Sequence, residues 1–234
     1  MTLPMIKQST CANCGHQQES YSLLSSNTDG FEDLDLRPAE MLRSSMHYWV
    51  QECQKCGFCF SDLDVELSEE GKGILNFVLH DSYYQEIKND KRLSELATRF
   101  YRQALILAAF DEHEKAGWAY MHAAWACDDD APAHAGANMC RMDAYRCFCK
   151  CKILGIPFAP QNGFEEVIMI DALRRASEFE KANTLCFNVI GYLDDTEVIR
   201  ILEFQRNLIW SRNCGCYNMG HVFPEKESNG SIIL

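Results

Sequence analysis

The stretches Cys11-Ala12-Asn13-Cys14-Gly15 and Cys53-Gln54-Lys55-Cys56-Gly57 are two copies of the motif Cys-x-x-Cys-Gly. With two residues between the thiols, both sulfurs can reach one metal ion from a tight turn, and the following glycine accepts the positive φ that a Cβ would resist. Two such turns supply four thiolates, which is a common ligand set of a structural zinc ribbon. The sequence therefore predicts one structural zinc ion held by Cys11, Cys14, Cys53 and Cys56.

Residues 1–61 are interpreted as the zinc ribbon with an inserted loop. Four thiolates close the coordination shell and leave no position for water, so the zinc is expected to be structural and not catalytic. The segment is too small to fold on an apolar core of its own, and the metal would stabilise it. Between the two motifs we predict short strands at residues 21–24 and 46–51, a turn at 27–30 and an ordered loop at 33–38.

Residues 62–90 are predicted to form an acidic linker and a first helix. Ser68 resembles a helix N-cap, and Glu69 and Glu70 would lie in the first turn, where a carboxylate is favourable. The helix is expected to end near Ile87.

Residues 91–234 show apolar side chains at helical spacing and are predicted to be a helical domain. Asp128-Asp129-Asp130 lacks the spacing of a calcium loop and is interpreted as a connection between helices, with Pro132 in the first turn of the next. Gly155 is expected to end that helix. The predicted helices cover residues 91–110, 112–127, 132–154, 164–176, 178–190 and 196–211.

One helix pair matches the tetratricopeptide pattern closely. Phe179 stands three residues before the small Ala182, so that the phenylalanine can fill the turn while the alanine lets two helices approach. Cys186 and Phe187 stand where the second helix needs bulk, and the other pairs fit less well. The predicted fold class is therefore mostly α, with a small β zinc ribbon at the N-terminus followed by a tetratricopeptide-like α-helical array.

The composition is that of a folded protein in a reducing compartment. Of 234 residues, 47% are hydrophobic, and the longest apolar run, residues 104–110, is far too short to span a bilayer. The first residues show no signal-peptide pattern, and the 13 cysteines are odd in number. We expect reduced thiols, a cytoplasmic location and no membrane association.

The net charge of −12 argues against nucleic acid as a general partner. Residues 62–90 alone carry eight acidic and two basic side chains, a net of −6. Because such a field repels phosphates, nucleic-acid binding through the ribbon is the less favoured interpretation.

The remaining cysteines have two open interpretations. Cys140, Cys147 and Cys151 share one helical face, and with Cys149 they would form a second metal or redox site, completed by Cys127 or Cys186. Alternatively they are small apolar residues of packed helices, which is the favoured interpretation. Cys59 follows Cys56 by three residues, but an iron–sulfur site needs a fourth nearby cysteine, so Cys59 is interpreted as a buried thiol.

No catalytic motif is recognisable, and the protein is not expected to be an enzyme. His113-Glu114 begins like a metalloprotease helix, but Gly117 stands where the second histidine must be. The basic stretch of Arg141, Arg146, Lys150 and Lys152 is interpreted as a solvated helix face, with an acidic or phosphate partner as the alternative.

Taken together, these segments resemble an uncharacterised bacterial family, a domain of unknown function with an N-terminal four-cysteine zinc ribbon followed by tetratricopeptide-like helices. The resemblance implies zinc binding and contacts with other proteins. It is carried by residues 11–16, 33–38, 49–57, 115–120, 123–125, 173–182 and 203–209.

The favoured function is a protein-interaction or scaffold module that binds a protein or peptide in the groove of the helices, because helix pairs expose a concave surface. The alternative is a metal- or redox-responsive sensor or enzyme that uses the helical cysteines. The identity of the partner and the placement of residues 231–234 are left open by the sequence.

Overall fold

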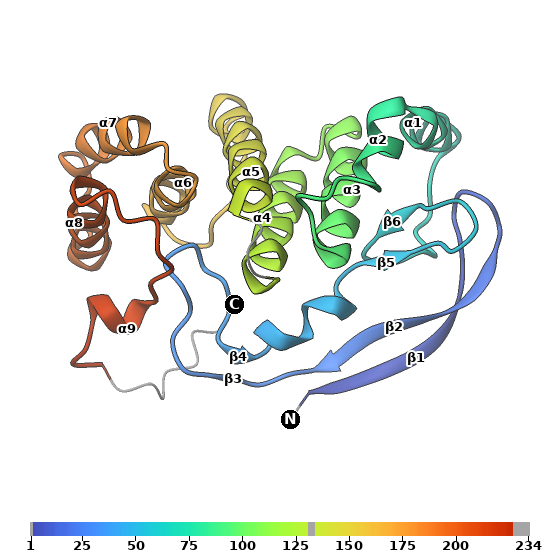
Figure 1. Cartoon of the computed structure of the whole chain (residues 1–234), viewed down its shortest axis with the longest axis horizontal. Coiled ribbons are helices and arrows are strands. Elements are labelled where there is room, and N and C mark those ends of the chain that lie inside the picture. Colours follow the sequence, from blue (N-terminus) through green and yellow to red (C-terminus); the bar gives the residue numbers. More distant parts are fainter. Residues whose placement is uncertain (1, 131–133, 227–234) are drawn as a thin grey trace.

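Helices make up most of the chain in the computed structural model, which describes residues 2–130 and 134–226. The helices are α1 (Glu69–His80), α2 (Ser82–Ile87), α3 (Glu95–Ala109), α4 (His113–Asp129), α5 (His134–Leu154), α6 (Phe164–Arg175), α7 (Phe179–Ile190), α8 (Thr196–Trp210) and α9 (Met219–Val222). Successive helices from α3 to α8 pack against one another and form an arch (Figure 1). The fold is therefore mostly α with a small β region at the N-terminus, as predicted.

The N-terminal part consists of three two-stranded antiparallel sheets that run along the inner side of the arch (Figure 1). Their pairing is β1 with β2, β3 with β4, and β5 with β6. The strands are β1 (Leu3–Thr10), β2 (Gln17–Ser25), β3 (Thr28–Asp29), β4 (Glu40–Met41), β5 (Gln51–Glu52) and β6 (Cys59–Phe60), with the 3-10 helix η1 at Arg43–Tyr48.

Hydroxyl and carboxylate caps fix the first residue of several helices. The Ser68 side chain accepts a hydrogen bond from the Gly71 amide, which confirms it as the N-cap of α1. The predicted end near Ile87 is wrong for this helix, because α1 ends at His80 and Asp81 caps the separate helix α2. Ser94 caps α3 in the same way, so that helix begins at Glu95 and not at the predicted residue 91. Gly155, with φ of 67°, follows α5 as expected. Pro132 and residues 231–234 lie outside the described residues.

The predicted strand at residues 46–51 is wrong for most of its length. Backbone hydrogen bonds from Ser45 to Leu42 and from Trp49 to Met46 form the 3-10 turns of η1, and only Gln51 belongs to β5. Met46 and Val50 are buried while Tyr48, which would share their face in a strand, is half-buried, so burial repeats with the spacing of a helical turn. The strand β1 was not predicted, because nearly all of its side chains are exposed and show no alternation.

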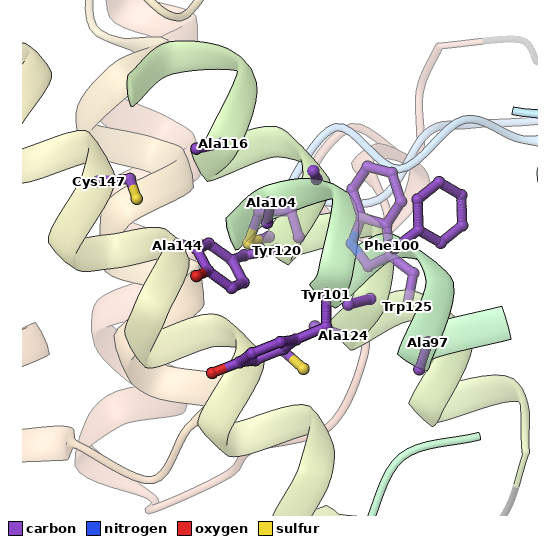
Figure 2. Close-up of a cluster of buried hydrophobic side chains, with 14 of the residues drawn as sticks. Ala97, Phe100, Tyr101, Ala104, Ala116, Tyr120, Ala124, Trp125, Ala144 and Cys147 are labelled. Carbon is purple, nitrogen blue, oxygen red and sulfur yellow. The ribbon is translucent and has the colours of Figure 1, made fainter. Parts of the chain in front are cut away.

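The largest core lies between α3, α4 and α5, where aromatic and small side chains alternate. Phe100 and Tyr101 of α3 lie beside Tyr120 and Trp125 of α4 (Figure 2). Buried alanines on all three helices allow the close approach, and at Gly117 of α4 a Cβ would lie 2.4 Å from the Phe148 ring. The packing of aromatic against small residues therefore sets the spacing of these helices.

A second core lies between α6, α7 and α8. Ala182 is fully buried there, and Phe179 packs against the same cluster. Both side chains therefore have the environment that the tetratricopeptide pattern predicts. Cys186 is also buried, but the prediction is wrong for Phe187, which is 78% exposed and adds no bulk to the core. The assignment to that repeat family stays a prediction.

The ribbon shares a third core with the first helices. Phe58 and Leu63 are fully buried in one cluster with Leu75 of α1, Tyr84 of α2 and Ile106 of α3. The division into residues 1–61, 62–90 and 91–234 stays a prediction. The apolar packing, however, runs continuously from the ribbon into the helices.

Candidate metal centre

Two hairpins present the four cysteines of the predicted zinc site. Cys11 and Cys14 lie in the turn that joins β1 to β2, where Thr10 pairs with Gln17. Cys53 and Cys56 lie in the turn that joins β5 to β6. The two motifs are thus both hairpin turns, as zinc knuckles are in ribbon folds.

The two turns have the same backbone geometry. The amide of Gly15 donates to the carbonyl of Cys11 at 2.9 Å, and the amide of Gly57 donates to that of Cys53 at 2.8 Å. Both glycines have positive φ, 66° and 72°, which is the conformation that the sequence motif predicts. The hydrogen bonds turn the backbone tightly enough for the two thiols of each motif to point the same way.

The four sulfurs form a compact group of the right size for zinc. All lie within 4.8 Å of one another, and the Cys11–Cys56 and Cys14–Cys53 Sγ distances are both 3.6 Å. A tetrahedral zinc with bonds of about 2.3 Å places its sulfurs about 3.8 Å apart. None of the four cysteines forms a disulfide. The cluster can therefore hold a metal ion, and the donor set fits zinc.

Side chains outside the cluster align the two hairpins. The amide of Gln18 in β2 donates to the carbonyl of Glu52 at 3.0 Å and accepts from the backbone amide of Gln54 at 2.9 Å. On the other side, the amide of Ala12 donates to the carbonyl of Leu63 at 2.8 Å. These hydrogen bonds hold the two pairs of thiols close together independently of any metal.

The second knuckle is fastened to the helices by a buried arginine. Arg102 of α3 pairs with Glu52 at 2.7 Å and lies 4.4 Å from the centre of the Tyr84 ring. The Tyr84 hydroxyl donates to the carbonyl of Gly57 at 2.9 Å. A Cβ at Gly57 would lie 2.5 Å from Arg102, whereas one at Gly15 would meet nothing within 4 Å. At the glycine position, the second knuckle is therefore packed more closely against the rest of the protein than the first.

Cys59 is a buried thiol and lies outside the sulfur cluster. It is fully buried, and this burial raises its pKa to about 12. A neutral thiol with an apolar environment is a packing residue, which agrees with the sequence interpretation.

The helical cysteines are not assembled into a second metal site. Within the described part of the chain, the four ribbon cysteines are the one group of three or more potential ligands close enough to share an ion. Cys140 and Cys151 are fully buried, and Cys147 lies among small side chains of the main core (Figure 2). Burial raises the pKa of all three, that of Cys147 to about 11. These features are those of apolar packing residues.

The basic stretch and the histidine candidate are likewise explained by packing. Arg141 is buried and pairs with Asp128, and Lys152 pairs with Glu165 and Glu166 at 2.8 and 2.7 Å. His113 is buried at the start of α4. Much of the predicted solvated face is therefore neutralised by neighbouring carboxylates.

The loop between β3 and β4 occupies the inner side of the arch, which the sequence had not indicated. It rises to α4, α5 and α6 (Figure 1), and its Leu34 is fully buried in the core of α6–α8. The amide of Leu34 donates to the carbonyl of Tyr217 at 2.9 Å. We call residues 30–39 the insert. It fills the part of the concave surface that these three helices form.

A buried ionic network holds the insert. Asp35 is fully buried and accepts hydrogen bonds from Trp125 Nε1 at 2.8 Å and Arg175 Nη1 at 2.9 Å. Burial by itself would raise the pKa of Asp35, but the charges of Arg175 and Arg141 outweigh it and lower the pKa below its usual value. The carboxylate is therefore ionised and bound.

Two aspartates at the end of α4 complete the network. Asp128 accepts from Arg175 at 2.6 Å and pairs with Arg141, and Asp129 pairs with Arg37 of the insert. Asp35, Asp128 and Asp129 thus face three guanidinium groups. Of the acidic triplet, interpreted from sequence as an inter-helix connection, Asp128 and Asp129 are instead the last residues of α4 and pair with buried arginines, while Asp130 follows the helix.

An open pocket remains where the ribbon meets α3 and α4. It has a volume of about 670 Å³ and is lined by Trp49 and Phe60 of the ribbon and by Leu107 and Trp118 of the helices, with Leu67 of the connecting segment. More of its surface is apolar than polar. No residue of the insert lines this pocket.

Within residues 2–130 and 134–226, no helix combines the length and the hydropathy that crossing a bilayer requires. Comparisons with protein-family models, curated proteins and solved structures found no match to this chain.

Proposed function

We propose that this protein is a zinc-stabilised interaction module, and that the ribbon and the helices together hold a protein or peptide segment of a partner. The observation that carries the proposal is the open, mainly apolar pocket between the ribbon and α3–α4. Concave apolar pockets of this size are the usual ligand sites of proteins, and apolar grooves also hold segments of partner proteins. The proposal includes a tetratricopeptide-like repeat and membership of the bacterial family that the sequence resembles.

The metal has a structural role in this proposal. Four thiolates in a closed shell leave no coordination position for a substrate. Zinc would fix the two hairpins, and the second hairpin supplies the ribbon wall of the pocket through Phe60 of β6. The metal would therefore support binding without contacting the partner.

The partner is expected at α3–α4 and not along the whole groove. The insert covers the inner side of α4–α6, where Leu34 and Asp35 are fully buried. Displacing the insert would expose the arginines that now pair with it, which costs more than binding in a surface pocket. The uncovered pocket is the site that needs no rearrangement.

Two observations support this function over the alternatives. Cys140, Cys147 and Cys151 lie buried and Cys149 is half-buried, and within the described residues none of them belongs to a group of three potential ligands. This does not favour a sensor or an enzyme based on them. The acidic charge of the chain does not favour nucleic acid. The 13 unpaired cysteines support a cytoplasmic location, where thiols are kept reduced.

The first test measures metal in freshly purified protein by elemental mass spectrometry. The proposal expects one zinc per chain in the wild type and little in Cys53→Ser, since three thiolates bind zinc less tightly than four. Two metals per chain, or iron, would contradict it and return attention to the helical cysteines.

The second test compares two apolar surfaces as sites for a partner. Proteins retained from a lysate of the source organism are identified by mass spectrometry for the wild type, Leu67→Ser and Phe187→Ser. Leu67 lines the pocket, whereas Phe187 is a 78% exposed residue on α7. The proposal expects a partner that is lost with Leu67→Ser and kept with Phe187→Ser. Equal behaviour of the two variants would contradict the pocket as the site.

A further inference from the structure

The pocket between the ribbon and α3–α4 has an acidic rim around an apolar floor. Three carboxylates line it, those of Glu66, Glu112 and Glu114, against the single ammonium group of Lys115. Lys115 pairs with Glu112 at 2.8 Å. That pair leaves Glu66 and Glu114 without an ion pair among the described residues.

Glu114 is the carboxylate best placed to meet a cation. It is half-buried, and burial raises its pKa, while Lys115 opposes and Glu112 adds to the shift. An ionised group in that position lacks full hydration and gains from an added positive charge. One wall of the pocket also belongs to residues 62–90, which have a net charge of −6. The carboxylates in the pocket and the acidic segment beside it thus both favour a positively charged ligand.

Two polar side chains in the pocket have no partner within the described part of the chain. Gln103 of α3 is only 8% exposed, yet its amide makes no hydrogen bond there. The imidazole of His122 in α4 makes no hydrogen bond there, and its ring lies 5.2 Å from Trp49 and 5.0 Å from Trp125. Amide and imidazole groups of this kind are satisfied by the backbone of a bound peptide.

We infer that the pocket binds a peptide segment of a partner protein in which an aromatic or aliphatic side chain is flanked by lysine or arginine. The apolar side chain contacts Trp49, Leu67 and Trp118, and the basic side chain pairs with Glu114 and Glu66. Gln103 hydrogen-bonds the peptide backbone. This inference rests on the proposed function, because it specifies the partner of the same pocket.

The experiment selects from a displayed library of random 12-residue peptides on the full-length, zinc-loaded protein. Selected peptides are synthesised with a fluorophore, together with versions in which every Lys and Arg is replaced by Glu. Dissociation constants are measured by fluorescence anisotropy at two salt concentrations. The expected peptides combine an apolar residue with basic neighbours, and charge reversal weakens binding by about tenfold or more.

Two substitutions at equivalent helix positions distinguish a local effect of the pocket carboxylate from the effect of the overall negative charge of the chain. Glu114 is the second residue of α4 and Glu180 the second residue of α7, so both neutralisations remove the same helix-dipole contribution and the same net charge. Glu114→Gln is expected to raise the dissociation constants of the basic peptides about threefold to tenfold. Glu180→Gln is expected to change these constants less than about twofold, because Glu180 lies far from the pocket and its charge is screened by salt.

Three other outcomes would overturn the inference, and each would identify which part of it is wrong. Selected peptides without basic residues, or charge-reversed peptides that bind equally well, would refute the partner chemistry but keep the pocket. Peptides that bind Leu67→Ser as tightly as wild type would refute the pocket and keep the interaction function. If the selection enriches no peptide over a protein-free surface, both the inference and the proposed function fail.

Discussion

The ribbon and the insert reach the helices by different chemistry, although they come from one short N-terminal segment. The ribbon is organised by its own sulfur cluster and is fastened to α3 through the Arg102–Glu52 pair. The insert contains no cluster of its own and is organised by the helices, through Asp35 and Arg175. The structure of the ribbon thus depends mainly on contacts within the ribbon, and that of the insert depends mainly on its contacts with the helices.

This difference predicts separate sensitivities. If the four thiolates hold zinc as proposed, a chelator should remove it from between the two hairpins and leave the ion pairs of the insert intact. Acid protonates carboxylates and weakens the insert network, and it also displaces metal from thiolates. A substitution in one region should therefore weaken that region and leave the contacts of the other unchanged.

Cys53→Ser is expected to have the largest effect, because it opens the metal shell. The free energy of unfolding should fall by about 4 kcal/mol or more, as is typical when a structural metal is lost. Zinc content and denaturant unfolding measure the two consequences. Cys59→Ala is the matched control, since this buried thiol lies three residues after Cys56 and outside the sulfur cluster. A loss of zinc in that variant would contradict the four-cysteine assignment.

Asp35→Asn is expected to loosen the insert and leave the metal bound. Removing the negative charge leaves Arg175 with one carboxylate partner fewer, and breaking a buried ion pair in this way costs about 3 kcal/mol. The measurement is denaturant unfolding together with zinc content. Asp29→Asn, at an exposed aspartate of β3, should change neither. Zinc loss in Asp35→Asn would show that the two regions are coupled.

The same carboxylate gives a pH dependence of known sign. Because the folded pKa of Asp35 lies below its usual value of 3.8, the stabilisation is present above that value. It is lost as the pH falls through the folded pKa. The stability of the wild type and of Asp35→Asn should therefore converge in strong acid, and a constant difference down to pH 2 would contradict the ionised state.

Gly15→Ala and Gly57→Ala compare the two knuckles directly. Both require a residue with positive φ, which costs about 1 kcal/mol for alanine. At Gly57 the added Cβ also displaces buried Arg102 from Glu52, so the cost should rise to about 2–3 kcal/mol. Denaturant unfolding in excess zinc gives the comparison. Equal costs would mean that the second knuckle is no more enclosed than the first.

The sequence predicts well what local spacing encodes. The two Cys-x-x-Cys-Gly motifs indicate the sulfur cluster, because each pair of thiols is set by one turn. The helices follow from apolar periodicity, with Ser68 as the predicted cap of α1. In both cases, the interacting residues lie within a few positions of each other.

Contacts between residues that are far apart in the sequence produce no recognisable spacing pattern. Asp35 and Arg175 are 140 residues apart, and neither has a spacing that indicates the other. Asp128 and Asp129 read as a polar connection because their partners lie on other elements. The exposed strand β1 was missed for a related reason, since only its pairing with β2 makes it a strand. Tertiary pairing, and not local preference, decides these regions.

His122 lies where the two regions meet and should give the smallest of these effects. Its ring contacts Trp49 from the ribbon side, and Arg37 of the insert is close enough to repel a proton on it. Burial, with a contribution from Arg37, lowers the pKa of His122 to about 4 from an ordinary value of 6.5. The folded protein therefore resists protonation that the unfolded chain accepts.

Stability due to His122 is complete above pH 6.5 and decreases as the pH falls toward 4, because only the unfolded state takes up the proton. The free energy of unfolding lost between these two pH values would be about 3 kcal/mol for a fully buried ring, and the partial exposure of His122 to the pocket reduces this loss. Between pH 7.5 and 5.5 the wild type should lose about 1 kcal/mol more than His122→Gln, measured by denaturant unfolding in excess zinc. His47→Gln, at an exposed histidine of η1, should follow the wild type. If His122→Gln has the same pH dependence as the wild type, the ring is hydrated in the pocket and the two regions do not enclose it together.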